Sequence, residues 1–474
     1  MDILKIDRLT HIYFIGIGGI GMSALARYFK SLGMTVAGYD KTPTTLTSDL
    51  ESEGIRISFN DSIESIPQEF TADKGNAGRI LVVYTPAVPK DHKGLSFFKS
   101  MNIPVKKRAE VLGMITADTF TVAVAGTHGK TTTSSIIAHL LTHAGLNCTA
   151  FLGGITKNYN SNYLPGKPSA GAGIVVVEAD EYDRSFLTLS PDLSVITSMD
   201  ADHLDIYGDK NYMEDSYRMF AAKLKPSGKL FFRLGLPLSD MNLVSSSYSV
   251  EGESDFSAVN MRIDDHRYYF DWTDNKNIIK DLTSDLPGWH NVQNSVVSVA
   301  IAKHLGVSDE QIKEGLRSYT GVKRRFDVQI RTNSMVYIDD YAHHPEELKA
   351  CISSVRALYP GKKILGIFQP HLFSRTRDFV DGFAQSLSLL DDLLLMDIYP
   401  ARELAIEGVD STIILDKMTL ESRSICKKED VLKELEDKKF DILLTLGAGD
   451  IDQLVAPIKK YLSSTYIQTL ADEN

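Results

Sequence analysis

The residues with the clearest chemical potential lie in the segment Val122-Ala-Val-Ala-Gly-Thr-His-Gly-Lys-Thr-Thr-Thr-Ser-Ser135. An apolar run ends at Gly126, a Gly-Lys-Thr sequence occupies positions 129–131, and an apolar-periodic segment follows. A strand, a glycine loop and a helix in this order bind phosphates, because backbone N–H groups at a helix N-terminus hold the oxyanions. In such a loop the lysine reaches the outer phosphates and the next threonine can hold Mg²⁺. The segment therefore predicts that the chain handles a nucleoside triphosphate.

The loop is shorter than the usual phosphate-binding pattern. That pattern has a glycine five positions before the Gly-Lys pair, where this chain has Val124, so the loop is Gly126-Thr-His-Gly-Lys-Thr131. A chance Gly-Lys-Thr in a surface turn is the alternative. A helix after the loop favours the phosphate site, and it is indicated by apolar residues that share one helical face, namely Ile136, Ile137, Leu140, Leu141 and Ala144.

Acidic residues and a histidine follow two further apolar runs. Gly171–Val177 has the β-branched character of a buried parallel strand and leads into Glu178-Ala-Asp-Glu-Tyr-Asp183. Leu193–Ser198 is a similar run and leads into Met199-Asp-Ala-Asp-His-Leu-Asp205. Ligands of open α/β sheets bind beyond the carboxyl ends of the strands, and hard oxygen ligands suit Mg²⁺. Glu178 and His203 are therefore candidate metal ligands, with a solvated loop as the alternative for any single acid.

A second glycine-rich motif lies near the N-terminus. Gly16-Ile-Gly-Gly-Ile-Gly21 matches the dinucleotide-binding fingerprint, and Asp40 stands where ribose hydroxyls are usually bound. A nicotinamide cofactor and a βαβ unit whose glycines serve packing alone both stay open. The surrounding pattern predicts strands at His11–Ile15, Thr35–Tyr39 and Ile80–Tyr84, with a helix through Met22, Leu25, Ala26 and Phe29.

Polar residues follow the predicted strands of the last third as well. Lys323-Arg-Arg-Phe-Asp327 opens this part. Strands at Met335–Ile338 and Lys363–Phe368 lead into Asp339-Asp-Tyr-Ala-His-His-Pro345 and Gln369-Pro-His-Leu-Phe-Ser-Arg-Thr-Arg377. Further strands are predicted at Leu393–Met396 and Asp441–Leu446, and Ser463–Asn474 is expected to be a loose tail. The pattern indicates a second Rossmann-like domain that can hold an anionic small molecule such as an amino acid.

These elements predict an α/β protein with three domains. The first, residues 1–116, is Rossmann-like; the second, 117–322, is a P-loop ATPase-like parallel sheet; the third, 323–474, is again Rossmann-like. In the second, residues 245–275 alternate as an antiparallel appendage does, and Pro287–Asn294 leads into a helix at Ser295–His304. Amide and imidazole side chains at that helix start can face a purine or cap the helix.

Composition narrows the class of protein. The chain has 474 residues, 43% of them hydrophobic and 24% charged, as an ordinary globular protein has. The net charge of −11 and the lack of a long basic block argue against a nucleic-acid partner. Three scattered cysteines suit a reducing cytoplasm, and there is no signal-peptide pattern or apolar run long enough to span a bilayer. We expect a cytoplasmic monomer or homodimer without a membrane partner.

Four blocks of the chain resemble the Mur ligases of bacterial cell-wall synthesis, which are three-domain, ATP-dependent amide-forming enzymes. The blocks are Phe14-Ile-Gly-Ile-Gly-Gly-Ile-Gly-Met-Ser23, Ala125-Gly-Thr-His-Gly-Lys-Thr-Thr-Thr133, Asp339-Asp-Tyr-Ala-His-His-Pro345, and Phe368-Gln-Pro-His371 with Ser374-Arg-Thr-Arg377. The resemblance covers nearly the whole chain and implies peptidoglycan precursor synthesis. The first and third blocks resemble the family member that adds L-alanine to UDP-N-acetylmuramate; the second block also occurs in folylpolyglutamate synthases.

The resemblance implies a reaction through an acyl phosphate. The lactyl carboxylate of UDP-N-acetylmuramate attacks the γ-phosphate of ATP, and the amine of L-alanine then displaces phosphate. It also implies that the first domain holds the UDP-sugar rather than NAD, since a diphosphate on a helix N-terminus serves both. The implied UDP-sugar contacts are Gly18, Gly19, Asp40, Arg108 and Glu110.

The remaining implied roles concern ATP, metal and amino acid. Lys130, Glu178, His203 and Arg325 are the implied catalytic residues, and Thr131, Glu178 and His203 the implied ligands of Mg²⁺ or Mn²⁺. ATP is expected to contact Gly126, Thr127, His128, Gly129, Lys130, Thr131, Thr132, His290, Asn291, Asn294, Arg325, Asp339 and Asp340. L-alanine is expected to contact Tyr341, His343, His371 and Arg375, with Arg375 on its carboxylate. The chain departs from the family at Leu372, where an arginine is common.

Other readings stay open beside this one. A sister ligase would attach a different amino acid, or a recycled peptide, to UDP-N-acetylmuramate. An NAD-dependent oxidoreductase would need only the first domain and would leave Lys130, Glu178 and His203 without a role. A non-catalytic nucleotide switch would not need the arginines and histidines of the third domain.

Overall fold

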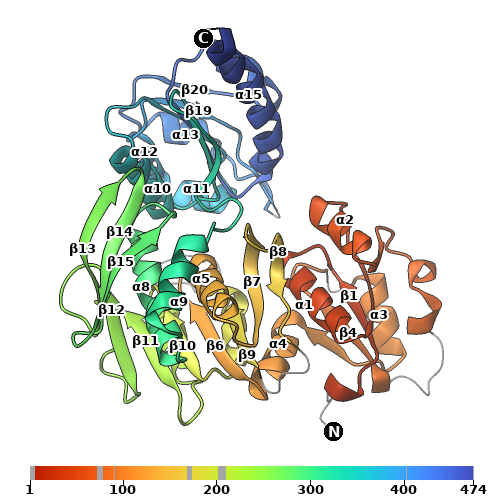
Figure 1. The fold of residues 1–474 in the computed structure, drawn as a ribbon. Coiled ribbons are helices and arrows are strands. Elements are labelled where there is room, and N and C mark those ends of the chain that lie inside the picture. Colours follow the sequence, from red (N-terminus) through yellow and green to blue (C-terminus); the bar gives the residue numbers. More distant parts are fainter. Residues whose placement is uncertain are drawn as a thin grey trace. The chain divides into compact units, whose positions relative to one another are not determined.

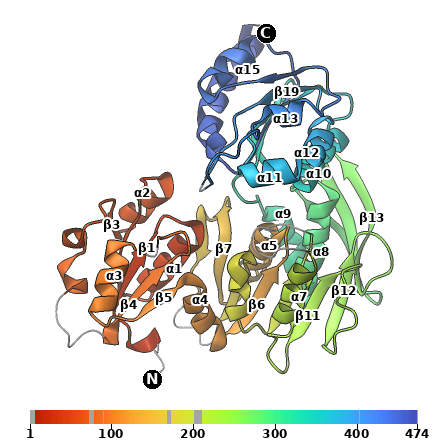
Figure 2. The same ribbon diagram turned by 180° about the vertical axis from the view of Figure 1, so that it is seen from behind.

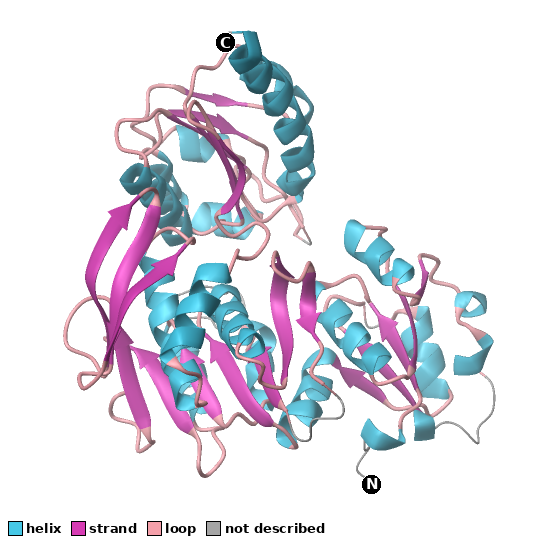
Figure 3. Cartoon of the chain, in the orientation of Figure 1, coloured by secondary structure: helices cyan, strands magenta, loops and turns pink. Residues whose placement is uncertain are grey.

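The computed structural model describes residues 6–71, 78–89, 91–167, 173–200, 210–401 and 403–472. The chain, whose fold is drawn in Figure 1, divides into two compact units. The first comprises Met1–Val259, Asp271–Leu282 and Gln293–Thr320, and the second comprises Asn260–Phe270, Thr283–Val292 and Gly321–Asn474. Both units are built on largely parallel sheets with helices packed against them (Figure 3), which confirms the predicted α/β class.

The N-terminal domain is a parallel sheet in the order β3-β2-β1-β4-β5. Its strands are β1 (His11–Ile15), β2 (Thr35–Tyr39), β3 (Arg56–Ser58), β4 (Ile80–Tyr84) and β5 (Val105–Lys107). Helices α1 (Ile20–Ser31) and α4 (Arg108–Ala117) pack on one face, and α3 (Lys93–Ser100) packs on the other; α2 (Thr45–Ser52) precedes β3. The glycine loop thus joins β1 to α1, as the sequence predicts.

The central domain places the phosphate loop at the middle of a parallel sheet. The relevant strands are β6 (Phe120–Ala125), β7 (Cys148–Thr156), β9 (Ile174–Glu178), β10 (Leu193–Ile196) and β11 (Lys229–Arg233), with β8 (Ser161–Leu164) antiparallel at the edge. β6 lies between β9 and β10, in parallel register with both. The loops after these three strands therefore meet at one sheet edge. Helices α5 (Lys130–His143) and α9 (Asp309–Ser318) cover one face and α7 (Lys210–Ala221) covers the other (Figures 1 and 2).

Four further strands extend this sheet: β12 (Ser245–Ser249), β13 (Phe256–Asp264), β14 (Arg267–Thr273) and β15 (Ile278–Ser284). Asp265 and His266 join β13 to β14, both with positive φ, as a two-residue hairpin turn requires. The following helix α8 (Trp289–His304) begins before Ser295, where the sequence had placed its start. The division between the two units passes through these strands and through α8.

The C-terminal domain has a sheet in the order β16-β17-β21-β18-β19-β20. Its strands are β16 (Asp327–Arg331), β17 (Val336–Asp340), β18 (Ile364–Phe368), β19 (Asp392–Leu395), β20 (Arg423–Ile425) and β21 (Ile442–Leu446). Its helices are α10 (Pro345–Leu358), α11 (Phe373–Asp378), α12 (Val380–Leu387), α13 (Thr412–Leu415), α14 (Val431–Glu436) and α15 (Val455–Asp472). β16 is antiparallel to β17, and the other paired strands are parallel.

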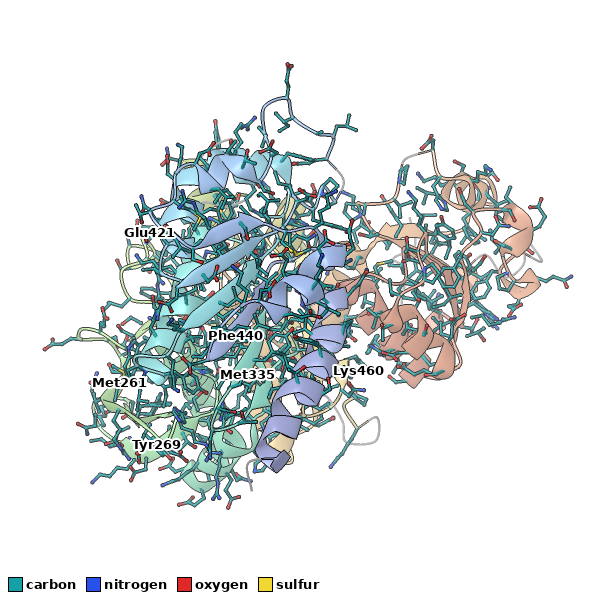
Figure 4. The ribbon with its side chains drawn as sticks, turned by 90° about the horizontal axis from the view of Figure 1, so that it is seen from above. Met261, Tyr269, Met335, Glu421, Phe440 and Lys460 are labelled. Carbon is teal, nitrogen blue, oxygen red and sulfur yellow. The ribbon has the colours of Figure 1, made fainter. Side chains whose placement is uncertain are left out.

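One face of the C-terminal sheet forms a core beneath α15. Met335 and Phe440, labelled in Figure 4, belong to this core together with Ile458 and Leu462 of the helix. The expectation of a loose tail from Ser463 was wrong, because α15 continues to Asp472. Apolar anchoring of its first turns gives the helix a base from which it extends. Across the described residues, no helix combines the length and apolar character needed to cross a membrane.

A polar network joins the N-terminal and central domains within the first unit. The side chain of Asn162 on β8 donates to the backbone carbonyl of Ile20 at 2.5 Å and to Ser23 Oγ at 2.9 Å. Arg27 donates to Asn162 Oδ1 at 2.5 Å. All these groups are at the interface of α1 with β8, so the first turn of α1 is tied to the central sheet. The glycine loop and the phosphate loop are thereby held on one framework.

Candidate functional site

The phosphate loop has the geometry of an anion-binding turn. Gly126 has φ +138 and Gly129 has φ +82, which are conformations that favour glycine. A Cβ on Gly126 would also overlap the hydroxyl of Thr197, which follows β10. Gly129 is the residue that precedes α5, so the loop delivers its backbone to a helix N-terminus. The short loop is thus a defined turn rather than a chance sequence.

The residues after β10 hold this loop in place. The backbone N–H of His128 donates to Ser198 Oγ at 2.8 Å, and the hydroxyl of Thr127 donates to the carbonyl of Asp200 at 2.7 Å. Thr197 donates from its hydroxyl to the carbonyl of His128. The loop therefore has its shape set by the neighbouring strand as well as by its glycines.

Lys130 is the first residue of α5 and turns back over the loop. Its ammonium donates to the carbonyls of Gly126 at 2.6 Å and Thr127 at 3.2 Å, and to Glu181 Oε1 at 2.8 Å. Burial disfavours the charged amine, but the carboxylates of Glu181 and Glu178 outweigh it and raise the pKa of Lys130. The lysine is therefore held as a cation at the loop. Glu181 was not among the predicted site residues, although it lies in the acidic run after β9.

Glu178 ends β9 and lies beside the phosphate-loop strand. Its Oε2 accepts a hydrogen bond from the backbone N–H of Gly153 on β7 at 3.0 Å. Thr131, at the start of α5, offers a second hard oxygen, and its side chain is buried. Oxygen donors of this kind fit Mg²⁺, which usually completes its shell with phosphate oxygens and water. In the described part of the chain, no group of three or more His, Cys, Asp or Glu side chains is arranged so that it could hold a metal ion.

His203, the other predicted metal ligand, lies outside the described residues. Thr132 is described and buried on the first turn of α5. Asn294 lies on α8, and a Cβ on Gly129 would be 2.8 Å from its Oδ1, so its amide borders the phosphate loop. His290 and Asn291 are on the first turn of the same helix and belong to the second unit. Asn291 donates to the carbonyl of Pro287 at 2.7 Å.

In the N-terminal domain, Asp40 holds the glycine loop. The backbone N–H of Gly18 donates to Asp40 Oδ2 at 2.7 Å, and a Cβ on Gly18 would be 2.9 Å from that oxygen. Gly19 precedes α1 directly. The Asp40 carboxylate thus fixes the glycine turn, and the backbone of this turn leads into the N-terminus of α1. Its predicted contact with a ribose stays a prediction.

Arg108 begins α4 and lies against the start of α1. A Cβ on Gly21 would overlap its guanidinium, and its Nη2 donates to Asp180 Oδ2 at 2.9 Å. Glu110 accepts from the backbone N–H of Lys107 at 2.7 Å, which is a helix-capping contact. Of these two among the five predicted sugar-nucleotide residues, Arg108 therefore contacts the neighbouring domain, while Glu110 caps its own helix.

A cavity lies between Arg108 and Glu178. Its volume is about 160 Å³, and its walls come from the start of α1, from α4, from β7 and from the end of β9. Gly21 and Arg108 lie on one side of it and Glu178 and Asp180 on the other. Arg108, one of the predicted sugar-nucleotide residues, and Glu178, the predicted metal carboxylate, thus border one partly open cavity in the first unit.

The C-terminal domain brings the four predicted amino-acid contacts together. The rings of Tyr341 and His343 lie 5.2 Å apart, and those of His343 and His371 lie 6.0 Å apart. Arg375 Nη1 is 3.4 Å from His371 Nδ1. Arg325 lies over the ring of Tyr341 at 4.9 Å. Residues from the segments after β17 and β18 and from the turn before β16 therefore form one cluster, in which Arg324 also lies over the Tyr341 ring at 5.3 Å.

Glu347 is a member of this cluster that the sequence reasoning missed. Its Oε2 accepts from the backbone N–H of His343 at 3.1 Å, and its Oε1 is 3.9 Å from Arg325 Nη1. It lies on the first turn of α10, and His343 directly precedes the helix cap His344, so the start of the helix brings the pair together. The four-residue spacing between His343 and Glu347 was the signal in the sequence that could have identified this contact.

Asp339 and Asp340 are on β17 rather than after it, as the sequence had placed them. Asp339 accepts from Thr445 Oγ1 at 2.7 Å and from Arg324 Nε at 3.2 Å. Asp340 accepts from the backbone N–H groups of Phe326 at 2.6 Å and Ala342 at 2.7 Å, and burial raises its pKa to about 6. Both carboxylates hold the turn that carries Arg325, and this structural role accounts for the two aspartates without a contact with ATP. Their contact with ATP stays a prediction.

Leu372 immediately precedes α11 with φ +71, a conformation that a leucine seldom adopts. Its backbone N–H donates to the carbonyl of Tyr399 at 3.0 Å, and its carbonyl accepts from Thr376 Oγ1 at 2.8 Å. The unusual backbone angle is therefore held by hydrogen bonds on both sides. Nothing in the structure explains why leucine stands where the family commonly has arginine.

Comparisons with known proteins cover the whole arrangement. Residues 11–119 match the model described as "Mur ligase family, catalytic domain", 124–302 the "Mur ligase middle domain", and 324–449 the "Mur ligase, glutamate ligase domain". A UDP-N-acetylmuramate–L-alanine ligase of Flavobacterium johnsoniae is 51% identical over 97% of this chain and 99% of its own length. One of Cytophaga hutchinsonii is 48% identical over 97% of this chain and 98% of its own.

Solved structures agree with these relatives. The UDP-N-acetylmuramate–alanine ligase of Thermotoga maritima superposes with a TM-score of 0.80, at 26% identity over 96% of this chain and 100% of that one. A murein peptide ligase of Psychrobacter arcticus shares the fold, with a TM-score of 0.68 and 22% identity over 96% of this chain and 98% of that one. The three matched domains, spanning the phosphate loop, the glycine loop and the His–Arg cluster, show that this chain belongs to the Mur ligase family.

Proposed function

We propose that this chain joins L-alanine to the lactyl carboxylate of UDP-N-acetylmuramate in an ATP-dependent reaction of peptidoglycan precursor synthesis. Relatives named UDP-N-acetylmuramate–L-alanine ligase are about half identical to this chain over nearly their full length. The observation that carries the proposal is the cavity between Arg108 and Glu178. We assign this cavity to the reacting carboxylate of a substrate held by the first domain, because the proposed metal ligand Glu178 borders it.

In the first step a carboxylate oxygen bonds to the γ-phosphorus of ATP, and ADP leaves. The transferring phosphoryl group carries negative charge, so cations and N–H donors around it lower the barrier. Lys130 and the backbone of Gly126–Thr132 supply these donors. Gly18, Gly19 and Arg108 hold the sugar nucleotide. Arg325 supplies a further cation from the third domain.

Glu178 and Thr131 are the oxygen ligands that we propose for Mg²⁺, together with His203. When bound, the ion supplies positive charge that neutralises the phosphate oxygens. Asn294 borders the phosphate loop, and we assign His290 and Asn291 to the adenine end of the same nucleotide. Mn²⁺ accepts the same hard ligands and is a possible substitute.

In the second step the alanine nitrogen bonds to the acyl carbon, phosphate leaves, and the amine gives up its proton. Tyr341, His343, His371 and Arg375 form the amino-acid site of this proposal. Arg375 suits the carboxylate of alanine, because a guanidinium binds a carboxylate with two parallel hydrogen bonds. Three buried thiols, Cys148, Cys351 and Cys426, are consistent with action in a reducing cytoplasm.

The test is phosphate release from ATP with a panel of acceptors. We expect release that requires UDP-N-acetylmuramate and is fastest with L-alanine, ahead of glycine and serine. Release without the sugar nucleotide would sink the ligase assignment. Release with a tripeptide but not with alanine would assign the chain to the alternative, a sister ligase that attaches a recycled peptide to UDP-N-acetylmuramate. The same samples, run on a sizing column, separate monomer from homodimer.

A further inference from the structure

The three N–H donors of Lys130 all have acceptors within the protein. Two of these acceptors, the carbonyls of Gly126 and Thr127, belong to the phosphate loop itself. The third is the carboxylate of Glu181 at 2.8 Å. An ammonium group has no fourth donor, so a phosphate oxygen can bind Lys130 only by replacing one of these three.

Glu181 is a buried partner. Its side chain is 3% exposed and that of Lys130 is 14% exposed, so water screens their attraction weakly. Burial raises the pKa of Glu181 to about 7, and the ammonium of Lys130 acts in the opposite direction. The two side chains form a buried ion pair with an N···O distance of 2.8 Å.

The backbone around Glu181 fixes that geometry. The carbonyl of Asp180 accepts from the N–H of Phe186 at 2.9 Å, and the carbonyl of Glu181 accepts from the N–H of Arg184 at 2.9 Å. Asp183 and Arg184 both have φ above +50, which turns the chain sharply after Glu181. Glu181 thus points at Lys130 from a tightly turned segment and not from an extended, adaptable one.

We propose that Glu181 is an internal counter-ion that competes with the phosphates of the nucleotide for Lys130, and that it lowers nucleotide affinity. The inference rests on the proposed nucleotide site at this loop. A phosphate that replaces Glu181 at Lys130 leaves a buried carboxylate without its cation, which is costly in a low-dielectric site. It also brings like charges close together. A neutral glutamine of the same shape removes both penalties.

The experiment measures the affinity for ADP with Mg²⁺ by calorimetry in the full-length chain. We expect Glu181→Gln to bind ADP roughly tenfold more tightly than the wild type, because the competing charge is gone. A residue with only a structural role would give the opposite sign, since damage to the loop weakens binding. Glu181→Gln affinity equal to or weaker than wild type overturns the inference.

The chain offers a matched control in Asp183. It lies two residues away in the same segment and pairs with Lys107 at 3.2 Å, but its side chain is 45% exposed. Asp183→Asn removes the same unit of charge without touching Lys130, so its ADP affinity should stay within about twofold of wild type. Equal tightening in both variants would mean a general charge effect and would also overturn the inference.

A second variant tests the inference if Glu181→Gln folds poorly. Glu181→Asp keeps the charge on a shorter side chain, which weakens the contact with Lys130, and we expect intermediate tightening. Unchanged or weaker affinity in a folded Glu181→Asp overturns the inference. The wild type distinguishes the two proposals: no ADP binding in it contradicts the nucleotide site itself, whereas normal binding with unresponsive Glu181 variants contradicts only the counter-ion.

Discussion

The carboxylate of Glu178 is held by the backbone N–H of Gly153, with an N···O distance of 3.0 Å. The two residues are on neighbouring parallel strands, and a Cβ on Gly153 would overlap that carboxylate. Gly153 thus acts on the site through the position of Glu178. The glycine is needed for close approach and not for an unusual φ.

Gly153→Ala should therefore displace Glu178 and lower kcat by about two orders of magnitude, because misplacement by an ångström costs that much. The chain should still fold, since alanine suits a strand at this φ. Gly78→Ala is the control, because a Cβ there has open space within 4 Å. Phosphate-release kinetics on both variants make the comparison, and a Gly153→Ala kcat within twofold of wild type would contradict the role of the contact.

Lys130→Ala should abolish turnover while leaving affinity for UDP-N-acetylmuramate near normal. The lysine contacts only the phosphate loop and Glu181 among the described residues, whereas the predicted sugar-nucleotide residues belong to another domain. Calorimetry with the sugar nucleotide and phosphate release with all three substrates measure the two properties separately. Loss of sugar-nucleotide affinity in this variant would show that the two sites are not independent.

Arg375→Ala should raise the KM for L-alanine at least tenfold with a smaller effect on the KM for ATP, because a bidentate guanidinium–carboxylate contact is strong. Arg377→Ala is a matched control two residues away. Arg375 is buried beside His371, whereas Arg377 is 53% exposed and pairs with Asp378. We expect the control to leave both KM values unchanged. An unaltered alanine KM in Arg375→Ala would move the amino-acid site elsewhere.

Because of His139, the free energy of unfolding should fall as the pH is lowered. It is buried on α5 between Tyr159 and Ser318, and burial lowers its pKa to about 4. The unfolded chain protonates this imidazole near pH 6.5 and the folded chain does not, so stability falls as the pH drops from 6.5 toward 4. At pH 5 this loss amounts to about 2 kcal/mol.

Urea unfolding of wild type and His139→Asn at pH 7.5 and pH 5 tests this effect. The variant loses packing and hydrogen bonds at both pH values, so only the difference between the two pH values reports the titration. We expect the wild type to lose about 2 kcal/mol more than the variant on acidification. Equal losses in the two proteins would exclude His139 as the cause.

Several strands, and the loops that contain the candidate site residues, could be predicted from the amino-acid sequence. The strands His11–Ile15, Thr35–Tyr39 and Ile80–Tyr84 have the predicted bounds, because each is a short apolar run closed by glycine or polar residues. The start of α8 and the helical end of α15 were not predicted. The start of α8 lies against a distant strand, where the rings of Trp289 and Tyr268 are 4.9 Å apart, and local patterns do not record such contacts.

The amino-acid sequence by itself determined the phosphate loop, the glycine loop and the acidic and basic segments that follow the strands, because each is a local pattern with a physical cause. Only the tertiary structure decided which of those polar residues meet. It paired Lys130 with Glu181, Glu178 with Gly153 and Glu347 with His343, while it used Asp339, Asp340 and Glu110 to hold turns and caps. The reason is that partner choice depends on strand order and burial, and these are set by contacts between residues far apart in the chain.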